Sequence, residues 1–436
     1  MMKKILIFGA GKSATSLIEY LCKACDENNW MLLVCDTDTV TAQSKINNCK
    51  NAKAISIDVM DEQKRIGLIT ESDIVISMLP HHLHFLVAKD CVDTHKNLLT
   101  ASYIDEKIKK LSKQIEENKL LFLCEMGLDP GIDHMSAMRL IHQVKNHGGK
   151  IISFKSHCGG LISPESDDNP WHYKITWNPR NIVMAGAAGA LYKINGTIKE
   201  IPYHEIFVDC EMVNVPGLFP LAWYPNRDSL SYISTYGLDD INTFIRTTLR
   251  HPAFCNGWNK IVNAGLTRVN DYEEIKNCDT YKEWYELKTK ASGTVLNNCD
   301  NEFSEQLNYL DLESNKKLET PIKNSAQLLQ NILERKLSMH PHDKDMIVML
   351  HEIGYIINYE RKEIRSCLIV KGEDATHTAM SKTVGLPLGI AAKLILQEKI
   401  KLTGLHIPVI PEIYEPVLAE LEKNQIKFNE ELTEFQ

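Results

Sequence analysis

A glycine-rich turn near the first residues has the spacing that a dinucleotide needs. The apolar run Lys3–Phe8 leads into Gly9 and Gly11, and Ala14 completes a G-x-G-x-x-A pattern at the start of the helix-period stretch Ser13–Cys25. The first glycine permits a tight turn, the second lets the backbone approach a pyrophosphate, and the small third residue lets helix pack on strand. The helix N-terminus also attracts phosphates. The pattern predicts a dinucleotide site at Gly9, Gly11, Lys12, Ser13 and Ala14, with a purely structural turn as the alternative.

The choice between NAD and NADP depends on the end of the second predicted strand, Met31–Cys35. Asp36 follows that strand and lies 25 positions beyond Gly11 (36 − 11). A carboxylate here can bind the ribose 2′-hydroxyl of NAD and repels the 2′-phosphate of NADP, and no arginine stands beside it. We therefore expect NAD or NADP as cofactor, with NAD favoured, while the alternative that Asp36 only caps the next helix stays open. Further cofactor contacts are expected at the carboxyl ends of the third and fourth strands, from Asp58, Ser77, Leu79 and Pro80.

The elements that must position these residues alternate regularly over the first 125 residues. Short β-branched runs alternate with helix-period stretches, and this alternation is typical of a doubly wound parallel sheet, a Rossmann-type α/β fold. The predicted strands are Lys3–Phe8, Met31–Cys35, Ala54–Asp58, Ile74–Ser77, Leu98–Thr100 and Leu121–Leu123, and the clearest predicted helices are Ser13–Cys25 and Asp105–Asn118.

The character of the sequence changes from about Gly127. Strand-like segments such as Ile151–Ser156 and Glu205–Glu211 mix with loops rich in proline and tryptophan, which predicts a second, α+β domain. The polar stretch from about 240 to 340 predicts a helical insertion in that domain. Glu363–Val370 is strand-like again, and Thr376–Gln397 predicts one apolar helix that is interrupted around 385–387.

Length and charge limit the classes of protein to which the chain can belong. With 436 residues, two or three domains are expected. The net charge of −8 argues against nucleic acid or an anionic membrane as the main partner. No apolar stretch approaches the roughly 18 residues that a membrane span needs. We therefore expect a small-molecule substrate, no nucleic-acid partner and no membrane partner.

The start of the sequence and the cysteines indicate a cytoplasmic enzyme. Gly9 and Gly11 interrupt the first apolar run before any pattern of a signal-peptide cleavage site. The twelve cysteines are scattered, as expected of reduced thiols. Cys22 and Cys25 form a C-x-x-C pair, but they share one face of a predicted helix with apolar residues, which favours packing over redox chemistry.

Longer strings resemble one family along nearly the whole chain. They are similar to the saccharopine dehydrogenases of the glutamate-forming type, also called saccharopine reductases. The string at 127–134, G-L-D-P-G-I-D-H, is the most specific. The other matching strings are Ile76–Pro80 with His84, Thr100–Tyr103, Glu125–Met126, Cys158–Leu161, Pro164–Glu165, Asp168–Pro170, Tyr224–Asp228, Thr248–Arg250 and Thr378–Gly385.

The resemblance implies a domain arrangement, a reaction and a set of contacts. A dinucleotide-binding domain at 1–126 would be completed by about 380–436, and 127–379 would form the substrate and dimerisation domain. The implied reaction is reversible hydride transfer between the nicotinamide and saccharopine, giving L-glutamate and 2-aminoadipate 6-semialdehyde. The implied substrate contacts are Ala101, Ser102, Asp129, Arg227, Thr248, Leu249 and Arg250, and the implied cofactor contacts are Leu128, Pro130 and Asn178.

The chemistry of saccharopine explains these residue types. Three carboxylates call for guanidinium groups, because arginine binds a carboxylate through two parallel hydrogen bonds and keeps its charge. Arg227 and Arg250 are the candidate anchors, and ion-paired surface arginines are the alternative. The amine needs a proton acceptor, for which Asp129 is the leading candidate, with Tyr103 and Cys158 as further catalytic candidates. The alternative is that Asp129 only shapes its turn.

Some features leave other interpretations open. Family members of this type are typically NADP enzymes with a basic residue where this chain has Asp36. His81, His82 and His84 lack the spacing of a zinc site, so no metal is expected, and His84 is expected beside the nicotinamide pocket. Alternative functions are a related C–N oxidoreductase such as carboxynorspermidine dehydrogenase, and a non-catalytic dinucleotide-binding regulator. A homodimer is expected by default.

Overall fold

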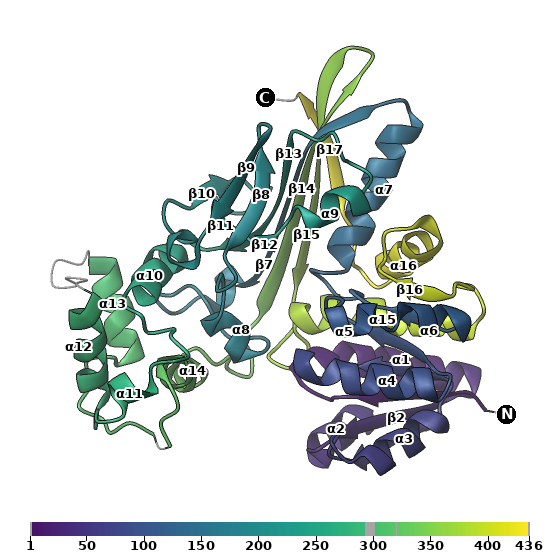
Figure 1. The fold of residues 1–436 in the computed structure, drawn as a ribbon, viewed down its shortest axis with the longest axis horizontal. Coiled ribbons are helices and arrows are strands. Elements are labelled where there is room, and N and C mark those ends of the chain that lie inside the picture. The colour runs from purple at the N-terminus through teal and green to yellow at the C-terminus, as the bar shows by residue number, and fades with distance from the viewer. Residues whose placement is uncertain (1, 293–300, 320, 435–436) are drawn as a thin grey trace. The chain divides into compact units, whose positions relative to one another are not determined.

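The computed structural model describes residues 2–292, 301–319 and 321–434 (Figure 1). The chain divides into two compact units, Met1–Gly148 with Thr376–Lys427 and Gly149–Ala375 with Phe428–Gln436. These limits differ from the predicted ones at two elements. Helix α7 (Ile132–Asn146) belongs to the first unit, where it contacts α16 (Pro411–Lys423), and strand β17 (Asn429–Glu434) belongs to the second, where it pairs with β15 (Glu360–Lys371). Of the predicted C-terminal segment, 435–436 lie outside the described residues.

The first unit is built on a seven-stranded parallel sheet, which confirms the predicted Rossmann-type fold. The strand order is β16-β6-β5-β4-β1-β2-β3, and each neighbouring pair is parallel. Ile5, Leu6 and Ile7 are fully buried, as expected of a strand covered by helices on both faces. The strands are β1 (Lys4–Phe8), β2 (Met31–Asp36), β3 (Ala52–Ser56), β4 (Ile74–Ser77), β5 (Asn97–Thr100), β6 (Leu121–Leu123) and β16 (Gly404–His406).

Helices connect and cover this sheet. The direction of the strand order reverses between β1 and β4, and such a reversal is the place where doubly wound sheets bind ligands. Besides α7 and α16, the helices are α1 (Thr15–Asn28), α2 (Thr39–Ile46), α3 (Glu62–Thr70), α4 (His84–Asp93), α5 (Glu106–Lys109), α6 (Ser112–Glu117) and α15 (Ala379–Leu396), with short 3-10 turns η1 (Lys12–Ala14) and η2 (His81–Leu83).

Helix α15 brings the chain back to the first unit and packs along α1 (Figure 1). A Cβ atom on Gly385 would lie 2.8 Å from the backbone nitrogen of Leu17, and one on Gly389 would lie 2.9 Å from the Tyr20 ring. These two glycines therefore permit the close helix contact. By length and composition α15 can cross a membrane, so the prediction that no stretch approaches that length is wrong. Because 78% of the helix is buried within the protein, its apolar character is that of a core helix.

The second unit contains a ten-stranded mixed sheet, which confirms the predicted α+β character. The main order is β10-β11-β13-β7-β14-β15-β17, in which β13 and β7 are parallel and the other neighbours are antiparallel. Strands β8, β9 and β12 lie beside this path. The strands not yet defined are β7 (Lys150–Ile162), β8 (Ala190–Ile194), β9 (Thr197–Ile201), β10 (Glu211–Val213), β11 (Leu221–Pro225), β12 (Arg227–Asp228), β13 (Thr243–Arg250) and β14 (Asp345–Ile357).

Two predictions in this unit are wrong. The predicted strand Glu205–Glu211 is mostly turn, since η4 (Tyr203–Glu205) is followed by irregular chain and β10 begins only at Glu211. The predicted helical insertion begins with β13, whose β-branched and aromatic residues favour a strand. The helices follow it, namely α10 (Pro252–Asn263), α11 (Tyr272–Ile275), α12 (Tyr281–Ser292), α13 (Asn301–Leu310) and α14 (Ser325–Lys336), while 293–300 and 320 lie outside the described residues.

Candidate active site

The glycine turn has the shape that a pyrophosphate requires. Gly9 has a φ of +101°, and a Cβ atom there would lie 2.9 Å from the Met78 carbonyl oxygen, so only glycine fits. A Cβ atom on Gly11 would meet nothing within 4 Å, so the space beside this residue is open to a phosphate. The Ser16 N–H at the start of α1 donates to Ser381 Oγ at 2.9 Å. The turn, with Lys12 and Ser13 at the N-terminus of η1, fits the predicted dinucleotide.

The carboxylate of Asp36 lies against the same turn. Its Oδ2 accepts a hydrogen bond from the Ala10 N–H at 2.6 Å, and its Oδ1 accepts from the Asp38 N–H at 3.0 Å. Asp38, and not Asp36, caps α2, because it accepts from the Val40 and Thr41 N–H groups. The alternative that Asp36 only caps the next helix is therefore wrong. A carboxylate has about four acceptor positions, so Asp36 retains capacity for a ribose hydroxyl.

Lys45 is a residue of this site that the sequence reasoning missed. Its Nζ donates to the carbonyl oxygens of Ala10 at 2.8 Å and Gly11 at 2.6 Å. Burial lowers the pKa of Lys45 to about 8, although the charge of Asp36 opposes this shift. No spacing in the sequence marks Lys45, which is one of many lysines and lies in the last turn of α2. The turn thus carries a cation as well as an acid beside the expected cofactor.

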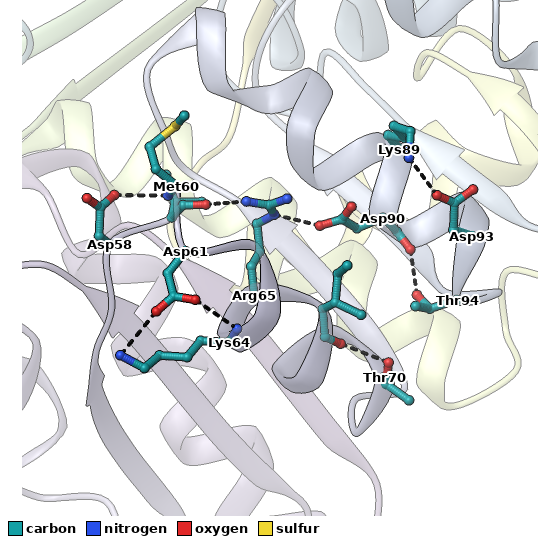
Figure 2. Close-up of polar contacts among 12 residues, drawn as sticks. Asp58, Met60, Asp61, Lys64, Arg65, Thr70, Lys89, Asp90, Asp93 and Thr94 are labelled. Atoms are coloured by element: carbon teal, nitrogen blue, oxygen red, sulfur yellow. Dashed lines mark hydrogen bonds and ion pairs between the residues drawn. The ribbon is translucent and has the colours of Figure 1, made fainter.

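The loop after β3 is held by a buried ion pair. Figure 2 shows Arg65 of α3 directed at Asp90 of α4, with Nε 2.5 Å from Oδ2. The Arg65 Nη1 also donates to the Val59 carbonyl oxygen at 2.5 Å. Asp58, just before Val59, is exposed and accepts from the Met60 N–H at 2.9 Å (Figure 2). The pair fixes this loop, and a cofactor contact by Asp58 stays a prediction.

The loops after β5 and β6 bring together several predicted substrate contacts. Because β5 and β6 are parallel neighbours, the loops that follow them meet at one edge of the sheet. The Glu125 N–H donates to the Ser102 carbonyl oxygen at 3.1 Å, and the Ile104 N–H donates to Glu125 Oε1 at 3.3 Å. A Cβ atom on Gly127 would lie 3.0 Å from the Ala101 Cβ. The segment Ala101–Tyr103 is thereby packed against the strand end that precedes Asp129.

The turn that carries Asp129 is shaped by its neighbours. Gly131 has a φ of +145°, and a Cβ atom there would overlap the Gly127 carbonyl oxygen. The Gly131 N–H donates to Asp133 Oδ1 at 2.6 Å, and Glu125 Oε2 lies 2.9 Å from His134 Nε2. Gly131 and Asp133 therefore contribute to the shape of the turn, and the alternative that Asp129 only shapes it stays open. The catalytic role of Asp129, which is half-buried, stays a prediction, as do the cofactor contacts of the buried residues Leu128 and Pro130.

A buried histidine joins the ends of β4 and β5. The Nδ1 of His84 lies 2.8 Å from Ser77 Oγ, and its Nε2 lies 2.7 Å from Ser102 Oγ. The Ser77 hydroxyl, a predicted cofactor contact, is therefore engaged by His84, and Leu79 and Pro80 lead from that strand end into η2. His84 is 3% exposed, and burial lowers its pKa to about 4. The imidazole is neutral at physiological pH.

In the second unit, Arg250 is a buried cation beside Cys158 and Thr248. Thr248 of β13 is paired with Cys158 of β7. Arg250 is 5% exposed, and its guanidinium lies 5.2 Å from the centroid of the Tyr173 ring and 5.7 Å from that of Phe254. Its Nη1 donates to the Leu249 carbonyl oxygen at 2.8 Å, and its Nε has no partner within the described ranges. In the same part of the chain no carboxylate forms an ion pair with Arg250. The group is suited to bind an anion.

Leu249 and Thr248 differ in what they can offer a ligand. Leu249 is fully buried in the apolar cluster that contains Leu161 and Ile245. Successive side chains of a strand point to opposite faces, so the Leu249 side chain points away from those of Thr248 and Arg250. Thr248 is half-buried. Of these two predicted substrate contacts, Leu249 can offer only its backbone.

Arg227 does not lie beside Arg250. It is exposed, has a φ of +51°, and lines a cavity of about 240 Å³ together with Asp228, Gly189 and Glu200. Pro225 is paired with Thr247, so Arg227 and Arg250 follow that pair in opposite directions along the sheet. The two arginines therefore do not act on one carboxylate within this unit, and the role of Arg227 stays a prediction.

Asn178, the predicted cofactor contact in the second unit, has a local structural role. It caps α8 (Pro179–Val183), because its Oδ1 accepts from the Arg180 N–H at 3.0 Å. A contact with the cofactor also stays a prediction.

These features define an NAD(P)-binding α/β protein with a second, mixed-sheet unit. Two family models match the chain, "Saccharopine dehydrogenase NADP binding domain" at residues 5–123 and "Saccharopine dehydrogenase C-terminal domain" at residues 127–426. The chain belongs to the saccharopine dehydrogenase family.

Individual relatives agree with this assignment. The chain is 33% identical over 454 residues to the mouse mitochondrial alpha-aminoadipic semialdehyde synthase, covering 99% of this chain and 48% of that protein. It thus spans about half the length of this relative. It is 31% identical to the L-glutamate-forming, NADP(+)-dependent saccharopine dehydrogenase of Saccharomyces cerevisiae, with 97% of each chain covered. The apo structure of the L-glutamate-forming yeast enzyme superimposes with a TM-score of 0.89 at 29% identity, covering 99% of this chain and 100% of the yeast chain.

Proposed function

We propose that the protein is an NAD(P)-dependent saccharopine dehydrogenase of the glutamate-forming type. The observation that carries the proposal is the buried Arg250 guanidinium, which has no carboxylate partner within the described ranges. A buried charge without a counterion is costly, so it is expected where a ligand supplies the opposite charge. The similarity to the yeast enzyme along 97% of both chains suggests which anion this is. A polyamine substrate such as carboxynorspermidine would favour acidic residues at this position.

In the proposed reaction, saccharopine loses a hydride from the carbon next to its secondary amine, and water then cleaves the resulting imine. The products are L-glutamate and 2-aminoadipate 6-semialdehyde, with one proton released. The nicotinamide, when bound, supplies the hydride acceptor. Arg250 binds a substrate carboxylate, and Asp129 accepts the amine proton. Ser102 orients the substrate, while Tyr103 and Cys158 are candidates for proton transfer during hydrolysis.

We infer that NAD is preferred over NADP. The support is Asp36, whose carboxylate is held at the glycine turn by two backbone N–H groups. A fixed carboxylate repels a 2′-phosphate and binds a ribose hydroxyl. Lys45 works against this preference, because its ammonium group is at the same turn, but its hydrogen bonds to Ala10 and Gly11 direct it at the protein backbone. The fungal relatives are named as NADP(+) enzymes, so Asp36 is expected to change the specificity of this chain.

Steady-state assays of the purified protein with saccharopine test both proposals. Each oxidised cofactor is supplied in turn, and reduced nicotinamide and the amino-acid products are measured. The expected result is L-glutamate with a higher kcat/KM for NAD. Formation of lysine and 2-oxoglutarate would assign the protein to the other class of saccharopine dehydrogenase. The expected homodimer and cytoplasmic location stay predictions.

A further inference from the structure

His84 lies between two hydroxyl groups that belong to different parts of the first unit. Ser77 ends β4, next to the point where the strand order reverses, and Ser102 lies in the loop after β5. Each ring nitrogen of His84 is within 2.8 Å of one of these hydroxyl oxygens. A continuous hydrogen-bonded chain therefore runs from the cofactor edge of the sheet to the loop expected to contact the substrate.

A neutral imidazole between two hydroxyls has two arrangements of equal charge. When the proton is on Nδ1, this nitrogen donates to Ser77, and Nε2 accepts the Ser102 O–H. The Ser102 oxygen then offers only lone pairs to a ligand. When the proton is on Nε2, it donates to Ser102, and the Ser102 hydroxyl is free to donate to a ligand. Both states are neutral. Their interconversion moves the Nδ1 proton to Ser77 and the Ser102 proton to Nε2, and it creates no charge only when Ser77 passes its own proton to water and Ser102 receives one from the ligand or from water.

We propose that His84 is a positioning residue that sets whether the Ser102 hydroxyl donates a hydrogen bond to the substrate or accepts one from it. This inference rests on the proposed function and adds a residue to it. The reaction draws on both roles, because an amine N–H is a donor before hydride transfer, whereas the oxygen added by water is an acceptor afterwards. Ser102 can donate to that oxygen only when the ring proton is on Nε2, since in the other tautomer its O–H is engaged by His84. The tautomer of His84 therefore decides whether the donor role is available.

The surroundings of His84 support a neutral ring. Burial is the main cause of its low pKa, and the positive charges that His81 and His82 of η2 can carry act in the same direction. Asp105, before α5, acts in the opposite direction. The ring of His81 meets that of His84 edge-on, with 6.4 Å between centroids. Burial and the two histidines together outweigh the effect of Asp105 on the pKa of His84. The ring is therefore neutral, and its single proton can be on either nitrogen.

Substitutions of His84 and Ser102 test the proposal. His84→Gln keeps one polar contact near Ser102 but cannot change tautomer. The expected result is a loss of roughly 10- to 100-fold in kcat for saccharopine, with cofactor affinity within about twofold of wild type. In the Ser102→Ala background, His84→Gln is expected to cost almost nothing further, because the effect passes through Ser102. Equal losses in the two backgrounds would overturn the proposal, as would full activity of Ser102→Ala.

His142→Gln is the matched control. His142 lies on α7, and its Nδ1 is 2.8 Å from the Tyr414 hydroxyl oxygen, so this variant also removes a histidine–hydroxyl hydrogen bond. It is expected to retain the kcat of wild type. Ser77→Ala should lower kcat less than His84→Gln does, because the ring keeps its contact with Ser102 but loses the group that exchanges its proton.

A measurement without turnover separates this proposal from the proposed function. If the wild-type protein fails to oxidise saccharopine, the proposed function is wrong, and ¹⁵N spectra of the histidine rings then decide the role of His84. A neutral His84 at pH 6 is expected, with Ser77→Ala and Ser102→Ala shifting its tautomer balance in opposite directions. A charged ring at pH 6, or a ring insensitive to Ser102→Ala, would refute the inference.

Discussion

Replacement of Arg250 by methionine should separate activity from stability. Methionine keeps much of the volume of the side chain and its contact with the Tyr173 and Phe254 rings, but it removes the charge. If Arg250 binds a substrate carboxylate through two charge-assisted hydrogen bonds, the loss is about 2–4 kcal/mol, or roughly 30- to 1000-fold in kcat/KM for saccharopine. Arg250→Lys should recover only part of this loss, because an ammonium group lacks the planar fork.

The structure predicts the opposite direction for folding stability. Arg250 is 5% exposed and has no carboxylate partner within the described ranges, so its desolvation is offset by its contacts with two aromatic rings and by its hydrogen bond to the Leu249 carbonyl oxygen, without a counterion. Such contacts contribute about 0.5–2 kcal/mol each, whereas burial of an unpaired charge costs several kcal/mol. The Arg250→Met variant should therefore have a Tm no lower than that of wild type.

The control for this experiment is Arg335→Met. Arg335 lies on α14 of the same unit, has its guanidinium 5.7 Å from the centroid of the Tyr281 ring, and has its counterion within the protein, since Nη1 lies 2.7 Å from Glu319 Oε1. This variant should retain kcat/KM within about twofold. A folded Arg250→Met variant that turns over saccharopine like wild type would refute the role of Arg250. A large drop in its Tm together with weaker cofactor binding would show that Arg250 is a structural residue.

Three further predictions concern the cofactor, the second arginine and the dependence on pH. The wild type should prefer NAD by about tenfold in kcat/KM, because a charge-assisted hydrogen bond from the ribose to Asp36 contributes roughly 1.5–3 kcal/mol. Asp36→Ser should reduce this preference, and a wild type that prefers NADP would contradict the prediction. Arg227→Ala should lower kcat/KM for saccharopine and leave NAD affinity unchanged. Because Arg227 is exposed, the loss in kcat/KM should be smaller than that caused by Arg250→Met, and an equal or larger loss would contradict this ranking. The pKa of His84 is lowered from 6.5 to about 4, so its contribution to stability is present above pH 6.5 and is lost as the pH falls toward 4. Between pH 7 and 5 the free energy of unfolding of the wild type should fall by about 2 kcal/mol from this cause. Denaturant titrations of His84→Gln at the same two pH values should show a fall that is smaller by about this amount.

The fold was largely predictable because its signals are local. The glycine turn and the buried β-branched runs identify the parallel sheet, and these patterns need no tertiary information. The segment Thr243–Arg250 was assigned to a helical insertion, although its β-branched residues indicated a strand. The place of α7 was missed for another reason. Its assignment to the first unit depends on packing against α16, which is more than 250 residues away in sequence, and no local pattern reports such a contact.

The candidate site was predictable to a smaller extent. Residue types and spacing located the turn at Gly9, and the resemblance to the family located the segment around Asp129. Lys45 was missed because its position at the glycine turn results from the orientation of α2. The hydrogen bonds of His84 with Ser77 and Ser102 were also missed, since they depend on side-chain directions at the ends of two strands. The structure shows that Arg227 is exposed and Arg250 is buried, a difference between the two candidate anchors that the sequence does not reveal.

Arg65 and Arg250 show how pairing can separate a structural charge from one kept for a ligand. Both side chains are about 95% buried. Arg65 has its counterion within the protein, since Asp90 lies 2.5 Å away, and the pair fixes the contact between α3 and α4 (Figure 2). Arg250 has aromatic rings where Arg65 has a carboxylate. Because an uncompensated buried charge lowers stability, its retention favours a role in binding over a role in folding. The carboxylate that completes the ion pair of Arg250 is then expected to come from the substrate.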